Sequence, residues 1–138
     1  MVKVFIETSV WIRYLTADDE EKFGDCVDLL KRIDNGKIIP YISAIVLLEI
    51  YFVLFSVYKF NKKVIIKAIE KLLLTKNLVL IEKTSTKKSL KLLAKYGVKF
   101  SDVMIAGQIP DGVSLCTYDT EFKKIDKLRL VEPKDLIK

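Results

Sequence analysis

The stretch IIPYISAIVLLEIYFVLFSVY, residues 38–58, decides how the rest of this chain is interpreted. It is long enough to cross a bilayer as a single helix. Two residues argue against a membrane span: Pro40 interrupts its start, and Glu49 lies near its middle, where an acidic residue costs about 3 kcal/mol on insertion. Residues 38–42 match a short strand instead, and Ser43 is a suitable N-cap for the apolar helix that follows. We therefore expect a buried strand and helix, and no membrane span.

The rest of the chain repeats this alternation of short apolar runs and helical patterns. Strands are expected at residues 2–6, 37–42, 78–81, 113–116 and 128–131. Helices are expected at 10–15, from the acidic turn 18–21 to about 33, and at 43–58, 62–75, 86–96 and 101–108, with a helical turn at 120–125. Helices between short apolar strands are typical of a parallel sheet covered on both faces. The predicted fold is a three-layer α/β/α arrangement with a central parallel sheet, formed by residues 1–138 as a single domain.

The composition excludes several classes of protein and site. The 138 residues include 24 Lys and Arg, 18 Asp and Glu and no His, so the net charge is +6. The lack of histidine excludes Ser–His triads, histidine general acid–base catalysis and His-containing zinc sites. The two thiols, Cys26 and Cys116, cannot complete a zinc site alone, and we expect them to be buried and free. The first residues lack the basic start of a signal peptide, which points to the cytoplasm.

Positive charge is concentrated in the second part of the chain. Residues 59–138 hold 18 basic and 9 acidic side chains, whereas residues 1–58 hold 6 basic and 9 acidic ones. This asymmetry indicates a polyanionic partner. Lysines at every fourth position form a stripe along each of two predicted helices; they are Lys63, Lys67, Lys71, Lys87, Lys91 and Lys95. The stripes are either solvated helix faces or a track for an RNA backbone, since lysines contact phosphates without reading bases.

Aromatic residues gather at the end of the apolar helix that follows Ser43. They are Tyr51, Phe52, Phe55, Tyr58 and Phe60. Packing in the core explains such a group, but aromatic side chains are also enriched at protein–protein interfaces. Both interpretations remain open.

Three carboxylates fall where a fold of this kind holds its ligands, and a fourth sits among apolar residues. Glu7 directly follows the strand 2–6, Asp119 lies three residues after the strand 113–116, and Asp102 is in the first turn of a predicted helix. Ligand sites in such folds lie at the carboxyl ends of the parallel strands. Glu49 has apolar neighbours all round on a helix expected to be buried, where a carboxylate needs a partner.

Each of these acids alone has a structural explanation: a salt bridge or a solvent-exposed helix edge for Glu49, a helix dipole for Asp102, a turn for Asp119. Together they form an oxygen-only set, and such ligands select Mg²⁺ or Mn²⁺. We expect the four carboxylates to converge on one point and, without metal, to have raised pKa values because like charges repel. Divalent ions can activate water and stabilise a phosphodiester displacement. The implied chemistry is metal-dependent phosphodiester hydrolysis.

Four segments resemble the signatures of PIN-domain ribonucleases, in particular the small toxins of VapBC toxin–antitoxin operons. They are IETSVWI at 6–12, VLLEIYFVL at 46–54, KFSDVMIA at 99–106 and TYDTEF at 117–122. Their order, their spacing and the total length fit, and the resemblance covers essentially the whole chain. It implies an endoribonuclease that uses Mg²⁺ or Mn²⁺ and acts on RNA, a homodimer, and a separate antitoxin protein whose segment covers the active-site groove.

The resemblance assigns catalytic and metal-binding roles to Glu7, Glu49, Asp102 and Asp119. It implies that the hydroxyls of Thr8, Ser9 and Thr117 orient the carboxylates and bound waters. Glu121 falls where some members have another acid. The family usually has Asp at the position of Glu7, and the extra methylene is expected to alter the metal geometry, favour Mn²⁺ or slow turnover.

Two other functions remain open at this stage. One is a PIN nuclease of RNA processing or DNA repair. The other is a catalytically weak or silent RNA-binding module, which the replacement of Asp by Glu7 allows. Lysine stripes carry no base code, so the sequence indicates no RNA target.

Overall fold

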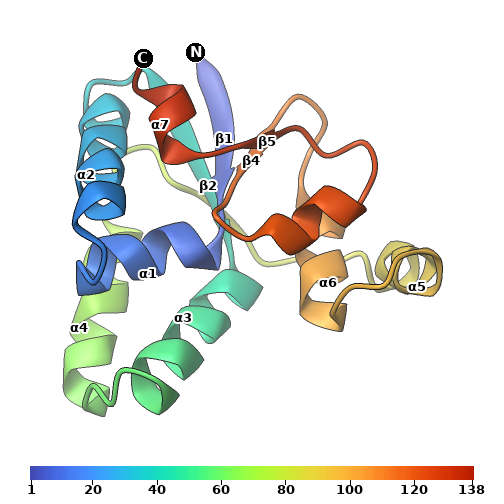
Figure 1. The fold of residues 1–138 in the computed structure, drawn as a ribbon, viewed down its shortest axis with the longest axis horizontal. Helices are drawn as coiled ribbons and strands as arrows, with labels where there is room; N and C mark the ends of the chain where they lie inside the picture. Colours follow the sequence, from blue (N-terminus) through green and yellow to red (C-terminus); the bar gives the residue numbers. More distant parts are fainter.

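The computed structural model describes residues 1–138 and contains a five-stranded sheet in which all strands are parallel. The strands are β1 (Val2–Ile6), β2 (Ile38–Ser43), β3 (Val79–Ile81), β4 (Ser114–Cys116) and β5 (Leu130–Val131). Their order is β3-β2-β1-β4-β5, so the chain starts at the centre, moves outward to β3 and returns to the other side (Figure 1). The order reverses at β1, which is where sheets of this type hold ligands at the strands' carboxyl ends.

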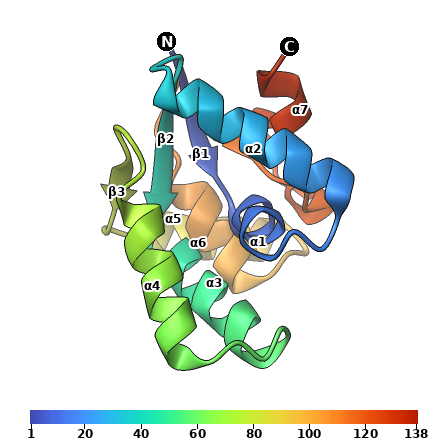
Figure 2. The same cartoon turned by 90° about the vertical axis from the view of Figure 1, so that its left-hand side faces the viewer.

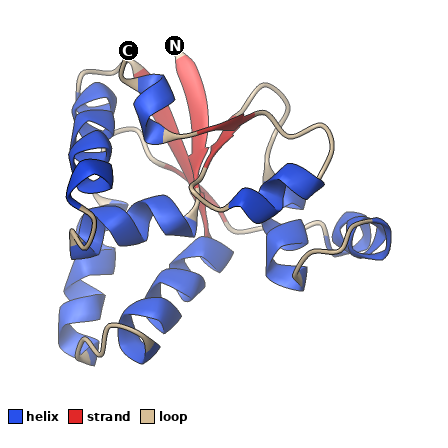
Figure 3. Cartoon of the chain, in the orientation of Figure 1, coloured by secondary structure: helices blue, strands red, loops and turns tan.

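Seven α-helices and one 3₁₀ helix surround the sheet (Figure 3). They are α1 (Thr8–Thr16), α2 (Glu20–Asp34), α3 (Ala44–Ser56), α4 (Lys62–Leu73), α5 (Thr86–Lys95), α6 (Phe100–Gln108), η1 (Thr120–Lys124) and α7 (Pro133–Leu136). Helices α1, α2 and α4 lie on one side of the sheet and α5 and α6 on the other (Figure 1), and the turned view shows α2 crossing in front of β1 and β2 (Figure 2). The predicted three-layer α/β/α fold with a parallel sheet is confirmed.

The strands form where the chain is apolar enough to be buried on both faces. In β1, Val4, Phe5 and Ile6 are completely buried. The predicted range of β1 is correct, and the other four strands begin and end within two residues of the predicted positions. Cys26 and Cys116 are buried and free, as expected. Both chain ends lie at the amino ends of the strands, away from the edge of the sheet that carries the acidic residues (Figure 1).

Side-chain caps explain several helix starts. Ser43 caps α3 as predicted, since its Oγ accepts a hydrogen bond from the backbone N–H of Val46. Helix α6 begins at Phe100, one residue before the predicted start, with Lys99 at the N-cap. Ser101 is therefore in the first turn of α6, and its hydroxyl interacts with the Glu49 carboxylate and lowers the pKa of Glu49. Helix α7 is an additional element that the hydrophobic pattern did not predict, because it spans only four residues.

Helix α3 is not buried on all sides, contrary to the prediction from its composition. Val46, Ile50 and Leu54 are fully buried in the core. Leu48, Phe52 and Phe55 are 63%, 65% and 51% exposed on the opposite face. No helix of the structure combines the length and the apolar character that a bilayer crossing requires. The apolar residues of α3 therefore serve two surfaces, one in the core and one facing outward.

Candidate active site

A cleft of about 430 Å³ lies where α1, α3 and α6 meet the carboxyl ends of β1 and β4. It is lined by Glu7, Thr8, Ser9, Ile12, Arg13, Glu49, Phe52, Val53, Tyr58, Lys99, Asp102 and Asp119. All four carboxylates that the sequence singled out line this cleft. They come from four separate segments, so the fold, and not a local motif, brings them together.

The carboxylate of Glu7 is held by its neighbours at the end of β1. Its Oε1 accepts hydrogen bonds from the backbone N–H of Ser9 at 3.0 Å and from the hydroxyls of Ser9 and Thr117 at 2.6 Å each. The Ser9 Oγ in turn accepts from the Tyr118 N–H, and the Thr117 Oγ1 accepts from the Asp119 N–H, both at 2.9 Å. The longer side chain of Glu7 folds back and caps α1. The turn after β4 thus fixes the position of Glu7.

Glu49 connects α3 to α1 through a single short contact. The Thr8 hydroxyl donates a hydrogen bond of 2.6 Å to its Oε1. Partial burial raises the pKa of Glu49, the hydrogen bond from Thr8 lowers it, and the nearby charge of Asp102 raises it again. Glu49 is therefore half-buried at the wall of the cleft, with a hydroxyl as its partner in place of a lysine.

Asp102 is the most unusual carboxylate of the site. Only 4% of the residue is exposed, and its Oδ2 has no hydrogen-bond partner. Burial raises its pKa to about 6, with a further contribution from the charge of Asp119, while Lys99 acts in the opposite direction. A buried carboxylate oxygen without a partner is energetically costly, so it is rarely found without an ion or water that compensates it. Asp102 thus contributes to the cleft a carboxylate whose Oδ2 no protein group compensates.

Asp119 lines the cleft, whereas the nearby Glu121 does not. The Oδ1 of Asp119 accepts the Glu121 N–H at 2.9 Å and caps the short helix η1, and the residue lines the cleft. The Glu121 carboxylate forms an ion pair with Lys124 at 2.7 Å, and Glu121 is not among the residues that line the cleft. Its charge reaches the site only weakly, since it raises the pKa of Asp102 less than burial and the charges of Asp119 and Glu7 do.

The four carboxylates share a cleft but do not meet at one point. No group of three acidic side chains is close enough to enclose a metal ion as they stand. The physical reason is that Glu7, Glu49 and Asp119 are each bonded to a hydroxyl or a backbone N–H. The pKa values of Glu7, Glu49 and Asp102 are raised, as expected, but burial is the largest cause and like-charge repulsion a smaller one.

None of the six predicted lysines lines the cleft. Lys63, Lys67 and Lys71 are on α4, and the other three on α5, which lie at opposite sides of the molecule (Figure 1). The cations that do line the cleft are Arg13 and Lys99, which the sequence reasoning missed. Helical spacing could have identified both residues as neighbours of the site, because Arg13 follows Ser9 by four residues and Lys99 precedes Asp102 by three.

Several solved structures share this fold. VapBC2 from Rickettsia felis, bound to a DNA fragment from its promoter, has a TM-score of 0.67 and 20% identity, and the match covers 96% of this chain and 98% of that one. VapC20 from Mycobacterium tuberculosis, a sarcin-ricin loop cleaving toxin, has a TM-score of 0.66 and 20% identity over 87% and 92% of the two chains. VapBC-1 from nontypeable Haemophilus influenzae has a TM-score of 0.69 and 17% identity over 97% and 99%.

Among curated proteins, no sequence matches this chain. The family model described as PIN domain matches residues 4–128, which include all four carboxylates of the cleft. The match extends over most of the chain, and the parallel sheet and the acidic edge described above agree with it. The chain belongs to the PIN domain family.

Proposed function

We propose that this protein is an endoribonuclease that depends on Mg²⁺ or Mn²⁺ and hydrolyses RNA phosphodiester bonds in the cytoplasm. The observation that carries this proposal is the buried, unpartnered Oδ2 of Asp102 in a cleft with three further carboxylates. Four acids in one cleft repel one another unless a cation neutralises them. The family and the relatives named above support a nuclease.

The residues present fit a hard divalent cation. Their donor atoms are all oxygens, from carboxylates and hydroxyls, and no thiol or imidazole lies in the cleft. Asp102, Asp119, Glu7 and Glu49 would hold the ion. When bound, a divalent cation supplies an activated water and stabilises the negative charge that develops during phosphodiester cleavage.

The side chains around these acids position them. The hydroxyls of Ser9 and Thr117 both bind Oε1 of Glu7, which leaves Oε2 for a ligand. The Thr8 hydroxyl fixes the Oε1 of Glu49. Asp102 is in the first turn of α6, where the helix dipole favours its ionised form. Orientation of this kind contributes to hydrolysis because small displacements of reacting groups are costly in rate.

We further propose that the enzyme is the toxin of a toxin–antitoxin pair. Two of the relatives were solved as VapBC assemblies, which supports an antitoxin partner. A pocket of about 700 Å³ between α1, α2 and α4, with Trp11, Leu30 and Leu72 among its lining, is apolar enough to receive a segment of such a partner. The exposed Leu48, Phe52 and Phe55 of α3 support a homodimer, since a patch of this kind favours association.

Incubation of the purified protein with structured and single-stranded RNAs in Mg²⁺, Mn²⁺ or EDTA tests the activity. Cleavage is expected with either metal and not with EDTA, and it should be lost in Asp102→Asn. The matched control is Asp111→Asn, an exposed aspartate outside the cleft, which should cleave like the wild type. Equal cleavage by Asp102→Asn and the wild type would contradict the proposal. An antitoxin-like reading frame directly upstream would favour the toxin over an RNA-processing or DNA-repair nuclease.

A further inference from the structure

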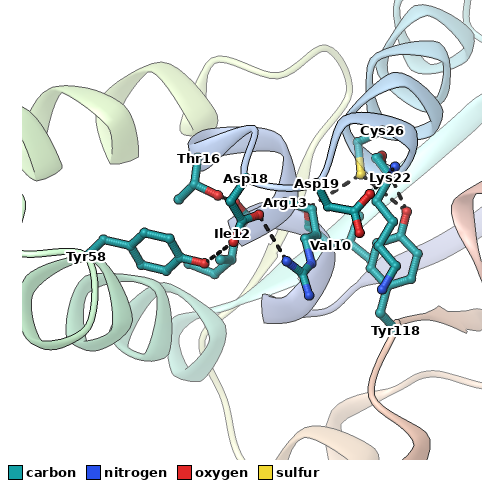
Figure 4. Close-up of polar contacts among 10 residues, drawn as sticks. All are labelled: Val10, Ile12, Arg13, Thr16, Asp18, Asp19, Lys22, Cys26, Tyr58 and Tyr118. Carbon is teal, nitrogen blue, oxygen red and sulfur yellow. Dashed lines mark hydrogen bonds and ion pairs between the residues drawn. The ribbon is translucent and has the colours of Figure 1, made fainter.

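A second polar cluster lies beside the carboxylates, at the edge of the cleft. The Arg13 Nη1 donates to Asp18 Oδ1 at 3.0 Å, and the Tyr58 hydroxyl donates to Asp18 Oδ2 at 2.5 Å. Asp18 thus lies between the guanidinium and the phenol and binds both (Figure 4). Arg13 and Tyr58 line the cleft that contains Glu7, Glu49, Asp102 and Asp119, whereas Asp18 does not line it.

Three separate segments build this cluster, which makes it more than a local surface pair. Arg13 is in the last turn of α1, Asp18 in the turn before α2, and Tyr58 follows the end of α3. The hydrogen bond from Tyr58 is the main reason that the pKa of Asp18 is lowered, and the bond from Arg13 adds to it. Asp18 is therefore ionised at neutral pH and holds both partners. The Arg13 and Asp18 side chains are each 32% exposed.

The bond to Asp18 leaves most of the Arg13 guanidinium free. A guanidinium has about five N–H donors, and Asp18 is the only hydrogen-bond partner of that side chain. The remaining donors are available to a ligand in the cleft that Arg13 lines. An RNA strand needs such a cation here, because the phosphates that flank the scissile bond would otherwise meet four carboxylates and a single lysine, Lys99. Arg is well suited to this task, since its planar fork binds phosphate oxygens in pairs.

We propose that Arg13 binds an RNA phosphate next to the scissile one, and that Asp18 and Tyr58 are positioning residues that hold its guanidinium toward the cleft. This inference rests on the proposed ribonuclease function and adds the contact that orients the strand. A purely structural ion pair between Arg13 and Asp18 is the competing explanation. The two explanations differ in how RNA binding responds to substitutions.

The test measures binding of a short fluorescein-labelled single-stranded RNA by fluorescence anisotropy in EDTA over a range of salt concentrations. Arg13→Ala should weaken binding about tenfold, the value of one charge-assisted contact. It should also reduce the slope of log K against log salt by about 0.7, the loss of one phosphate contact. Arg13→Lys should restore the slope but only part of the affinity. Arg129→Ala, at an exposed arginine outside the cleft, should change neither.

Asp18→Asn and Tyr58→Phe separate positioning from charge. Asp18→Asn removes a negative charge near the cleft, so electrostatics alone predicts tighter RNA binding. Positioning predicts weaker binding for Asp18→Asn and also for Tyr58→Phe, which leaves the charge unchanged. Circular dichroism melts show that each variant is folded before binding is compared. Tighter binding by Asp18→Asn would overturn the positioning roles.

Equal binding by Arg13→Ala and the wild type, or no binding by the wild type, would overturn the phosphate contact. Because the measurement is made in EDTA, it does not depend on cleavage. A wild type that binds RNA through Arg13 but never cleaves it with metal would contradict the proposed nuclease and support the phosphate contact. In a cleaving enzyme, Arg13→Ala should raise KM more than it lowers kcat.

Discussion

Replacement of Asp102 by Asn should stabilise the metal-free protein although it removes the metal-dependent activity. Asn has nearly the same shape as Asp but carries no charge. The native cleft surrounds Asp102 with other carboxylates and leaves its Oδ2 without a partner. A residue that is held in an unfavourable ionised state lowers stability in return for function, and the neutral replacement removes that cost.

The size of the effect follows from the pKa of Asp102, which burial and neighbouring carboxylates raise from its ordinary value of 3.8 to about 6. One pKa unit corresponds to about 1.36 kcal/mol. At pH values above about 6, ionisation of Asp102 therefore lowers the free energy of unfolding by about 3 kcal/mol. The variant loses a favourable interaction of about 0.3–1 kcal/mol with the N-terminus of α6. The net gain is about 2 kcal/mol, or a melting temperature about 5–8 °C higher.

The gain should depend on pH in one direction. A raised pKa means that native Asp102 binds its proton more tightly than the unfolded chain does, so wild-type stability falls as pH rises from near 4 through 6. The stability of Asp102→Asn does not fall in this way, because the variant has no carboxyl group at this position to ionise. The stability difference between the two proteins should therefore grow from less than about 1 kcal/mol at about pH 4.5 to about 2 kcal/mol above pH 7.

Urea unfolding of both proteins in EDTA at several pH values measures this difference. Asp111→Asn serves as the control, since this exposed residue is outside the cleft and its substitution should leave the pH profile unchanged. If Asp102→Asn is less stable than the wild type above pH 7, or the difference does not vary with pH, the reasoning about the buried carboxylate is refuted.

Three further predictions concern the same cleft. Glu7→Asp should raise Mg²⁺-supported RNA cleavage and Glu7→Gln should lower it. The extra methylene of Glu7 displaces the carboxylate by about 1 Å, a change that can cost about 100-fold in rate. An unchanged or lower rate for Glu7→Asp would show that the site is adapted to Glu. Mn²⁺ at about 100 times its Kd should raise the free energy of unfolding by about 2.7 kcal/mol relative to EDTA, and thermal melts without any shift at millimolar Mn²⁺ would argue against a usable site. Thr8→Val removes the 2.6 Å hydrogen bond to Glu49 and should reduce the cleavage rate while the protein stays folded by circular dichroism, whereas wild-type cleavage by this variant would mean that Glu49 needs no such support.

The strands and the acidic edge could be predicted from the sequence because their patterns are local. A strand buried on both faces must be apolar throughout; Glu7 directly follows such a run, and Asp119 comes three residues after another. The exposed face of α3 could not be predicted in this way. Phe52 and Phe55 have the same hydrophobicity as core residues, and only the packing shows that they face outward.

The missed cations have a similar explanation. Lysine stripes on α4 and α5 dominate the charge pattern, but the three-dimensional arrangement keeps them out of the cleft. Arg13 and Lys99 are single basic residues, and only their helical spacing from Ser9 and Asp102 links them to the site. The Ser9 bonds to Glu7 are local, whereas the bonds from Thr117 to Glu7 and from Thr8 to Glu49 join segments far apart in the chain, so no local pattern predicts these partners.

The most direct test of the central claim is a titration of Mn²⁺ into the purified protein, followed by electron paramagnetic resonance of the free ion. The account predicts that the wild type binds Mn²⁺ and that Asp102→Asn binds it far more weakly, because the variant lacks the buried carboxylate whose Oδ2 has no other partner. Asp111→Asn should bind like the wild type. If the wild type binds no Mn²⁺, or if Asp102→Asn binds it equally well, the cleft is not the metal site of a nuclease.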